Sequence, residues 1–122
     1  MMTKAFARRA ALSCLLLFAA TASQAQFLNI LGASPVTFFT EADNKLMLAA
    51  IDQALADPAE GVAKEWNNPA TPASGSVTAR RSYVADGRKC RDLLVANSFK
   101  TLKGEAVHAF CQDGAGQWKL QQ

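Results

Sequence analysis

The second half of the sequence alternates short β-prone runs with turns that contain glycine. The runs are residues 62–67, 76–85, 89–100, 105–111 and 117–120. Asp86-Gly87 separates the second run from the third and is among the strongest hairpin signals, because glycine tolerates a positive φ. Further turns are expected at Lys103-Gly104 and across residues 113–116. Runs joined by such short turns predict a small antiparallel sheet of four to five strands.

A helix is expected before the first run, from Thr40 to about Ala56. In Thr40-Glu41-Ala42-Asp43 the hydroxyl can accept a free backbone N–H, and the acids favour the positive end of a helix. Asp57-Pro58 and Gly61 end it. Its apolar side chains recur at helical spacing and predict the face that packs on the sheet: Met47, Leu48, Ile51, Ala54 and Leu55. The expected fold class is α+β, with the helix packed on the sheet in a domain of residues 40–122.

Residues 1–25 are typical of a cleaved secretory signal peptide. A basic start is followed by an apolar run over residues 10–20, and Ser23 and Ala25 are small residues suited to signal peptidase. The run is shorter than the roughly 20 residues that span a bilayer, which favours cleavage before Gln26 over membrane anchoring. Cys14 lies too early in the run for a lipid-bearing cysteine. The sequence therefore predicts an exported protein.

Charge is balanced in the part expected to remain after cleavage. Lys4, Arg8 and Arg9 belong to the signal, and the other 97 residues carry 10 basic and 10 acidic side chains. Binding of nucleic acid needs a basic excess on the folded domain, so this class of partner is not expected.

Residues 26–39 form an apolar but non-periodic segment that Gly32 and Pro35 interrupt. They are expected to be an arm or linker before the domain. The segment either packs back over the domain or is an exposed adhesive region that touches a membrane or a partner. A loosely held arm is favoured, because N-terminal segments are often poorly ordered unless they are tied down.

Two cysteines, Cys90 and Cys111, remain after cleavage and predict a single disulfide in an oxidising compartment. If Lys103-Gly104 centres the hairpin between them, they do not lie directly opposite one another. The bridge then requires a bulge, a longer loop or a different strand order. With His108 as the one histidine, the chain offers a poor zinc set, and neither a metal nor a cofactor is expected.

Aromatic and basic side chains are the candidate binding residues. Trp66 and Trp118 lie at the edges of expected strands, where they either cap the core, which is favoured, or form a sugar or peptide platform. A hairpin would bring Arg80 or Arg81 near Arg88 or Lys89, and the dense basic stretch comprises Arg80, Arg81, Arg88, Lys89 and Arg91. It either binds an anionic partner, such as lipopolysaccharide phosphate or an acidic peptide, or protects an edge strand from aggregation. The protective role is the commoner one.

Signs of catalysis are weak. No serine or carboxylate can be placed beside His108 from the sequence, so a satisfied structural histidine is favoured over a catalytic base. A phosphate-binding glycine loop, a nucleophile elbow and an HExxH motif are all missing from the sequence. The chain is therefore not expected to be an enzyme, and a small hydrolase that depends on His108 is the least favoured class.

From Leu46 to Leu120 the order of landmarks resembles the C-terminal domain of the bacterial 17 kDa outer-membrane surface antigens. The matching pieces are the helical segment 49–55, Trp66-Asn67-Asn68-Pro69, Gly75-Ser76-Val77-Thr78, Asp86-Gly87-Arg88-Lys89-Cys90-Arg91-Asp92, Phe110-Cys111-Gln112-Asp113-Gly114 and Gln117-Trp118-Lys119. Family members commonly carry a lipid-bearing cysteine and a glycine zipper before this domain, which this sequence does not show. Gln112 stands where the family usually has a basic residue.

The resemblance implies an exported domain of the periplasm, outer membrane or cell surface. Its expected role is non-enzymatic, either binding or structural, with an envelope component or a protein as partner. The alternative is a soluble periplasmic inhibitor or accessory module, in which the loop of residues 69–75 engages an envelope enzyme.

Overall fold

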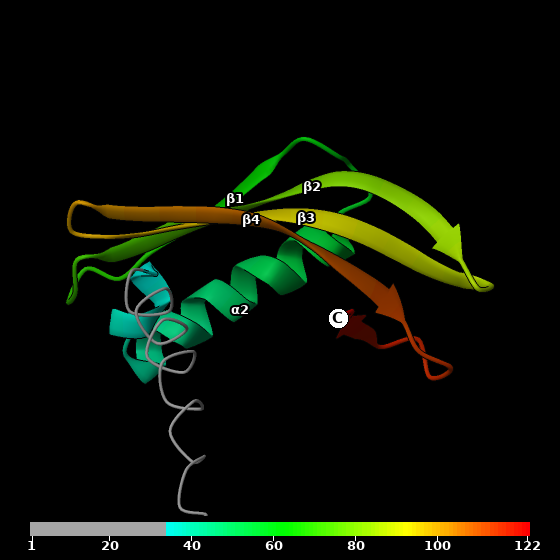
Figure 1. The fold of residues 1–122 in the computed structure, drawn as a ribbon, viewed down its shortest axis with the longest axis horizontal. Coiled ribbons are helices and arrows are strands. Elements are labelled where there is room, and N and C mark those ends of the chain that lie inside the picture. The colour runs from blue at the N-terminus through cyan, green and yellow to red at the C-terminus, as the bar shows by residue number, and fades with distance from the viewer. Residues whose placement is uncertain (1–33) are drawn as a thin grey trace, which may run out of the picture.

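The computed structural model describes residues 34–122. The expected signal peptide and residues 26–33 lie outside this range. One α-helix, α2 (Glu41–Ala56), lies beneath one face of a five-stranded sheet (Figure 1). The elements in chain order are η1 (Pro35–Phe38), α2, β1 (Ala63–Asn67), β2 (Ala73–Ala85), β3 (Arg88–Phe99), β4 (Leu102–Gln112) and β5 (Trp118–Leu120).

The sheet is an antiparallel meander in the order β1-β2-β3-β4-β5. This arrangement confirms the α+β fold class. The hairpin at Asp86-Gly87 is confirmed as well, because Ala85 pairs with Arg88 and both turn residues have a positive φ, 51° and 73°. Strand β2 begins at Ala73, three residues before the expected start, so the preceding loop is shorter than the sequence predicts.

The prediction of a turn at Lys103-Gly104 is wrong. The chain turns at Lys100-Thr101 instead, and Lys103 and Gly104 lie within β4, opposite Ser98 and Asn97. Gly104 serves a close approach rather than a turn, because a Cβ there would lie 3.2 Å from Cδ of Pro35 in η1. A glycine in a β-prone run is compatible both with a turn and with a close approach of another part of the chain, and the sequence alone does not distinguish the two.

With the turn at Lys100-Thr101, the two cysteines can pair without a bulge. Cys90 now lies directly opposite Cys111 in the β3–β4 ladder, with 4.0 Å between their Cα atoms. The predicted disulfide is confirmed, and it needs neither a bulge nor another strand order. Both cysteines are buried.

The start of α2 is a capping box, as the sequence predicts. The Asp43 backbone N–H donates to Thr40 Oγ1 at 3.2 Å, and the Thr40 N–H donates to Asp43 Oδ2 at 2.9 Å. Asp43 also accepts hydrogen bonds from the loop after β1, from Asn68 Nδ2 at 2.8 Å and from Thr71 Oγ1 at 2.7 Å. This one buried carboxylate therefore joins the helix start to the loop that leads into β2.

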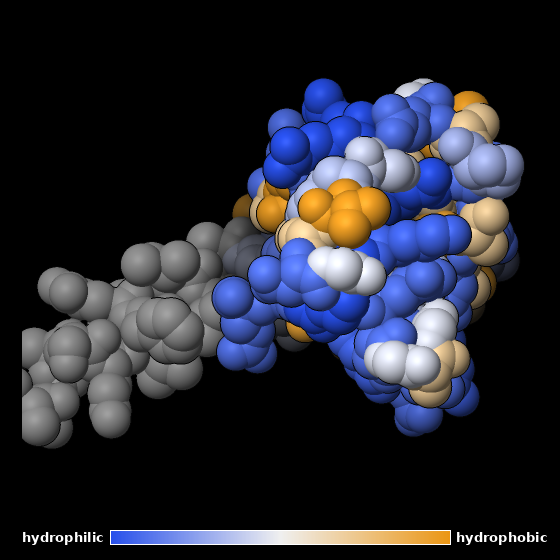
Figure 2. All heavy atoms as spheres, turned by 90° about the vertical axis from the view of Figure 1, so that its right-hand side faces the viewer, coloured by the Kyte–Doolittle hydropathy of each residue, from blue (hydrophilic) through white to orange (hydrophobic). Residues whose placement is uncertain are grey.

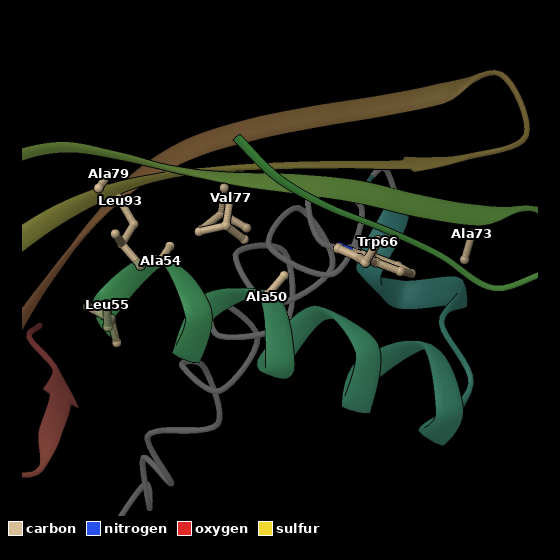
Figure 3. Close-up of a cluster of buried hydrophobic side chains, with 9 residues drawn as sticks. Ala50, Ala54, Leu55, Trp66, Ala73, Val77, Ala79 and Leu93 are labelled. Atoms are coloured by element: carbon tan, nitrogen blue, oxygen red, sulfur yellow. The ribbon is translucent and has the colours of Figure 1, made fainter. Parts of the chain in front are cut away.

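The face of α2 that meets the sheet differs in part from the predicted one. Ala50 and Ala54 point toward Val77 and the other strand residues of the core (Figure 3), and Leu55 is buried beside them. Leu48 is 54% exposed, so its assignment to the core face is wrong. Small alanines let the helix approach the sheet closely, and this turns Leu48 away from the core.

A row of three residues crosses the sheet on the helix side. Trp66 on β1 lies opposite Gly75 on β2, and Gly75 lies opposite Asn97 on β3. A Cβ at Gly75 would lie 2.5 Å from Trp66 Nε1 and 2.5 Å from the carbonyl oxygen of Ala96. Only glycine therefore fits beneath the indole ring at this position.

The end of the 26–39 segment packs against the domain. Phe38 stacks on Phe99 with ring centroids 5.4 Å apart, and Phe39 meets the Trp66 ring edge-on at 5.3 Å. Residues 35–38 form a 3-10 helix rather than an extended arm, because Pro35 favours the first turn of a helix. This part of the segment is attached to the domain.

Asp43 should make stability depend on pH. Burial acts to raise the pKa of its carboxyl, but hydrogen bonds from Thr40, Thr71 and Asn68 outweigh it and hold the pKa below the ordinary 3.8. A carboxyl whose pKa is lowered by folding stabilises the protein at pH values above its unfolded-state pKa. This stabilisation is lost as the pH falls through the folded-state pKa. Three other carboxyls have lowered pKa values, Asp57 through Lys64, Asp92 through Arg81, and Asp113 through the Gln117 backbone N–H.

Thermal unfolding at pH 7 and at pH 3 tests this dependence. We expect the melting temperature to fall on acidification, and Asp43→Asn to lower it at pH 7 while making the fall smaller. The matched control is Asp52→Asn, which removes an exposed carboxylate of the same helix. An Asp43→Asn protein with the same pH dependence as the Asp52→Asn control would contradict this role.

Candidate functional site

An apolar groove lies between α2 and the strands that the helix leaves uncovered. The helix packs mainly over β1, β2 and β3, so the inner face of β4 and the short strand β5 remain open beside it. The groove has a cavity volume of about 440 Å³. Its principal apolar lining comes from Met47, Leu48 and Ile51 on the helix and from Phe110, Trp118 and Leu120 on the sheet.

The local sequence explains each wall of the groove. Met47 and Ile51 are four residues apart and share one side of α2. On β4, Phe110 and His108 are two residues apart, so both face the same side of the sheet, and Leu120 on β5 lies opposite Phe110. Leu48 is 54% exposed and Leu120 53% exposed, so large aliphatic side chains are open to solvent at the rim.

Three polar side chains also line the groove: Asp52, Asn97 and His108. Asn97 is 9% exposed, and its Oδ1 is a buried acceptor without a hydrogen-bond partner among residues 34–122. His108 is exposed, with no hydrogen bond of its ring among the described residues, so the expected satisfied structural histidine is not what the structure shows. The reason is that α2 does not cover this part of β4.

Strand β4 also offers a free edge that meets the groove at His108. Strand β5 pairs with it only at Phe110–Gln112, and no described strand lies beyond residues 102–108. These residues are mostly exposed. The backbone groups of an uncovered edge strand can pair with a further strand.

The candidate tryptophans have different surroundings. Trp66 is 7% exposed and belongs to the core cluster. Trp118 is partly buried and lines the groove. The structure does not bring the two together into one platform, because they lie on the opposite edge strands β1 and β5.

Arg81 is held on the outer face of the sheet by its neighbours. Its Nε donates to Asp92 Oδ2 at 2.7 Å, and its guanidinium lies 4.4 Å from the centroid of the Tyr83 ring. The register places Arg81 opposite Asp92, after an irregularity between Ala79 and Arg81. The expected approach of Arg80 or Arg81 to Arg88 or Lys89 is therefore wrong, since Ala85 and Val84 lie opposite those two residues.

Arg91 is turned inward, beneath the end of α2. It is 7% exposed, and its guanidinium donates to the carbonyl oxygens of Ala54 at 2.8 Å, of Asp57, and of Pro58 at 3.4 Å. Its Nε donates to Ser82 Oγ at 2.9 Å. The helix has no basic residue in its last turn, so Arg91 supplies from the sheet the positive charge that a helix end favours.

The five basic residues thus do not form one surface. Arg91 is buried, Arg81 is paired, and Arg88 makes one long contact of 3.4 Å with Gln121. Arg80 and Lys89 are exposed. Hydrophilic residues cover most of the end of the molecule at the β2–β3 hairpin (Figure 2). Binding of an anionic partner by these residues stays a prediction.

The sequence pattern did not indicate the groove. The helical spacing predicts that Met47, Leu48 and Ile51 belong to the core as one stripe, and it says nothing of Phe110. One signal was present, since the stripe is wider than the face that a helix buries against a small sheet. Within residues 34–122, no three histidine, cysteine or acidic side chains cluster closely enough to hold a metal ion.

A comparison with protein families bears on the identity of this domain. Residues 53–119 match the model of the 17 kDa outer membrane surface antigen. The match spans more than half of the chain. The chain belongs to this family. No curated protein and no solved structure is similar enough to be matched to it.

The family match covers the disulfide, Arg91 and, except for Leu120, the sheet side of the groove. It begins near the end of α2 and ends within β5, at residue 119. Membership in the surface-antigen family supports an exported protein of the cell envelope. Among the described residues, no helix has the length and apolar character needed to cross a membrane.

Proposed function

We propose that this surface-antigen domain has a non-enzymatic binding role in the cell envelope, and that it binds an extended, apolar polypeptide segment. The observation that carries the proposal is the groove itself, in which exposed aliphatic side chains lie beside the free edge of β4. Apolar side chains of a bound segment would fill the groove, while its backbone pairs with residues 102–108. Recognition by strand addition combines these two kinds of contact.

The energetics of the groove favour an apolar occupant. Burial of one leucine or phenylalanine side chain stabilises a complex by about 1.5 to 3 kcal/mol. Leu48, Leu120 and Val36 at the rim each retain more than a third of their exposure, so they have surface to bury.

Binding of an apolar dye tests the groove directly. We expect N-phenyl-1-naphthylamine to bind, and Leu48→Lys to weaken its binding about tenfold, because it places a charge at the rim of an apolar site. The matched control is Val84→Lys, since Val84 is 71% exposed and lies outside the groove. Equal dye affinity in the two variants would contradict the proposal.

A further inference from the structure

We infer that the segment bound in the groove is the C-terminal end of a polypeptide, and that its terminal carboxylate binds to Lys89 and Arg91 in a pocket that adjoins the groove. The inference rests on the proposed function, because it needs a groove that accepts an extended apolar segment. It narrows the partner from any apolar segment to one that ends in a free carboxylate.

The pocket lies between the end of α2 and the hairpin of β2 and β3, and it has a cavity volume of about 380 Å³. Leu55 and Trp118 line both this pocket and the groove. Figure 1 shows the C-terminal strand β5, which carries Trp118, on the same side of the sheet as α2. The register connects the two sites as well, because Arg91 of the pocket lies directly opposite Phe110 of the groove. A segment that fills the groove therefore has the pocket next to its end.

Arg91 brings a buried positive charge to this pocket. Its side chain is 7% exposed, and no carboxylate among residues 34–122 forms a salt bridge with it. Its hydrogen-bond partners are neutral: the carbonyl oxygens of Ala54, Asp57 and Pro58, and the hydroxyl of Ser82. The end of a helix offsets about half of an elementary charge, so an excess of positive charge remains. A buried charge is stabilised by a partner of the opposite sign.

Hydrogen-bond donors are left for such a partner. Nη2 of Arg91 carries a pair of N–H groups, and it makes a single long contact of 3.4 Å, with the carbonyl oxygen of Pro58. Lys89 lines the same pocket and lies two residues from Arg91 on β3, so both side chains are on the helix side of the sheet. Lys89 is exposed and forms no salt bridge with the described residues.

Asp57 also lines the pocket, but its carboxylate is already paired. It accepts hydrogen bonds from Lys64 Nζ at 2.6 Å and from the Ala59 N–H at 2.9 Å. The pocket thus offers cationic donors beside an apolar groove, and the end of an apolar chain supplies the complementary groups. Arginine and lysine donate charge-assisted hydrogen bonds to a carboxylate, and capture of a terminal carboxylate is a recurring mode of peptide recognition.

Calorimetric titration of the exported, purified protein with two synthetic peptides tests the inference. Both peptides alternate serine and leucine and end in leucine, one with a free carboxylate and the other with an amide. We expect the carboxylate peptide to bind about tenfold more tightly, because charge-assisted hydrogen bonds are lost with the amide. Equal affinity for the two peptides would overturn the inference and leave the proposed function standing. If neither peptide binds, the proposed function fails as well.

A lysine variant locates the carboxylate. Lys89 is replaced rather than Arg91, whose loss is expected to destabilise the domain. Lys89→Gln should reduce the tenfold ratio to about threefold, since an exposed ion pair contributes modestly. The matched control Lys119→Gln should leave the ratio unchanged, because Lys119 is exposed and lines neither the pocket nor the groove. An unchanged ratio in Lys89→Gln would overturn the inference.

A third peptide separates the chain end from a side-chain carboxylate. It is amidated and has aspartate in place of one serine, and we expect it to bind as weakly as the first amidated peptide. Affinity equal to that of the free-carboxylate peptide would show that any carboxylate suffices, and it would overturn the assignment to a chain terminus.

Discussion

Replacing Arg91 with methionine should lower the free energy of unfolding by about 4 kcal/mol, the largest effect expected of any single side chain. Methionine keeps the apolar stem but removes the guanidinium, and it leaves the carbonyl oxygens of Ala54, Asp57 and Pro58 without their donor. These acceptors lie at the end of α2, where the helix cannot satisfy them itself. Urea unfolding followed by circular dichroism measures the change.

Two variants show whether the effect comes from the guanidinium. Arg91→Lys should recover only part of the loss, because an ammonium group cannot reach three carbonyls with the fork of an arginine. Arg88→Met removes a neighbouring arginine with one long contact and should change stability by about 0.5 kcal/mol or less. If Arg91→Met is as stable as Arg88→Met, the anchoring role of Arg91 is wrong.

Removing the disulfide with Cys90→Ala/Cys111→Ala should lower the free energy of unfolding by about 3 kcal/mol. The bridge joins residues separated by 21 positions across two strands, and it restricts the unfolded chain more than the folded one. The same urea experiment measures the loss.

The unaltered protein under a reducing agent is the control for this pair. Once mass analysis shows both thiols free, its stability should match that of the double variant. A double variant as stable as the oxidised protein would show that the strand pairing alone holds β3 against β4.

Local signals in the sequence were enough for much of the fold. Thr40 and Asp43 cap the helix as their spacing predicts, and Asp86-Gly87 forms its hairpin, because both features depend on residues close together in the chain. Gly104 does not form the expected turn, because its role depends on Pro35, nearly 70 residues earlier. The two cysteines left after cleavage predict the disulfide, but the register that places them opposite one another depends on the turn at Lys100-Thr101, which the sequence does not indicate.

The candidate site depends on how the elements pack, and the sequence alone does not give this. The apolar stripe of α2 was expected to meet the sheet as a whole. In the structure Ala50 and Ala54 make that contact, and Leu48 is left at the rim of the groove. The sequence groups Arg91 with its basic neighbours. On β3, however, Arg91 and the buried Leu93 are two residues apart, so both face the helix side of the sheet.

Amide hydrogen exchange in β4, resolved by residue with NMR, tests the central claim most directly. If an extended apolar segment fills the groove and pairs with the free edge, every second amide in residues 102–108 should exchange at least ~100-fold more slowly with a saturating synthetic peptide of alternating leucine and serine than without it. Equal, fast exchange of these amides with and without the peptide would contradict the account.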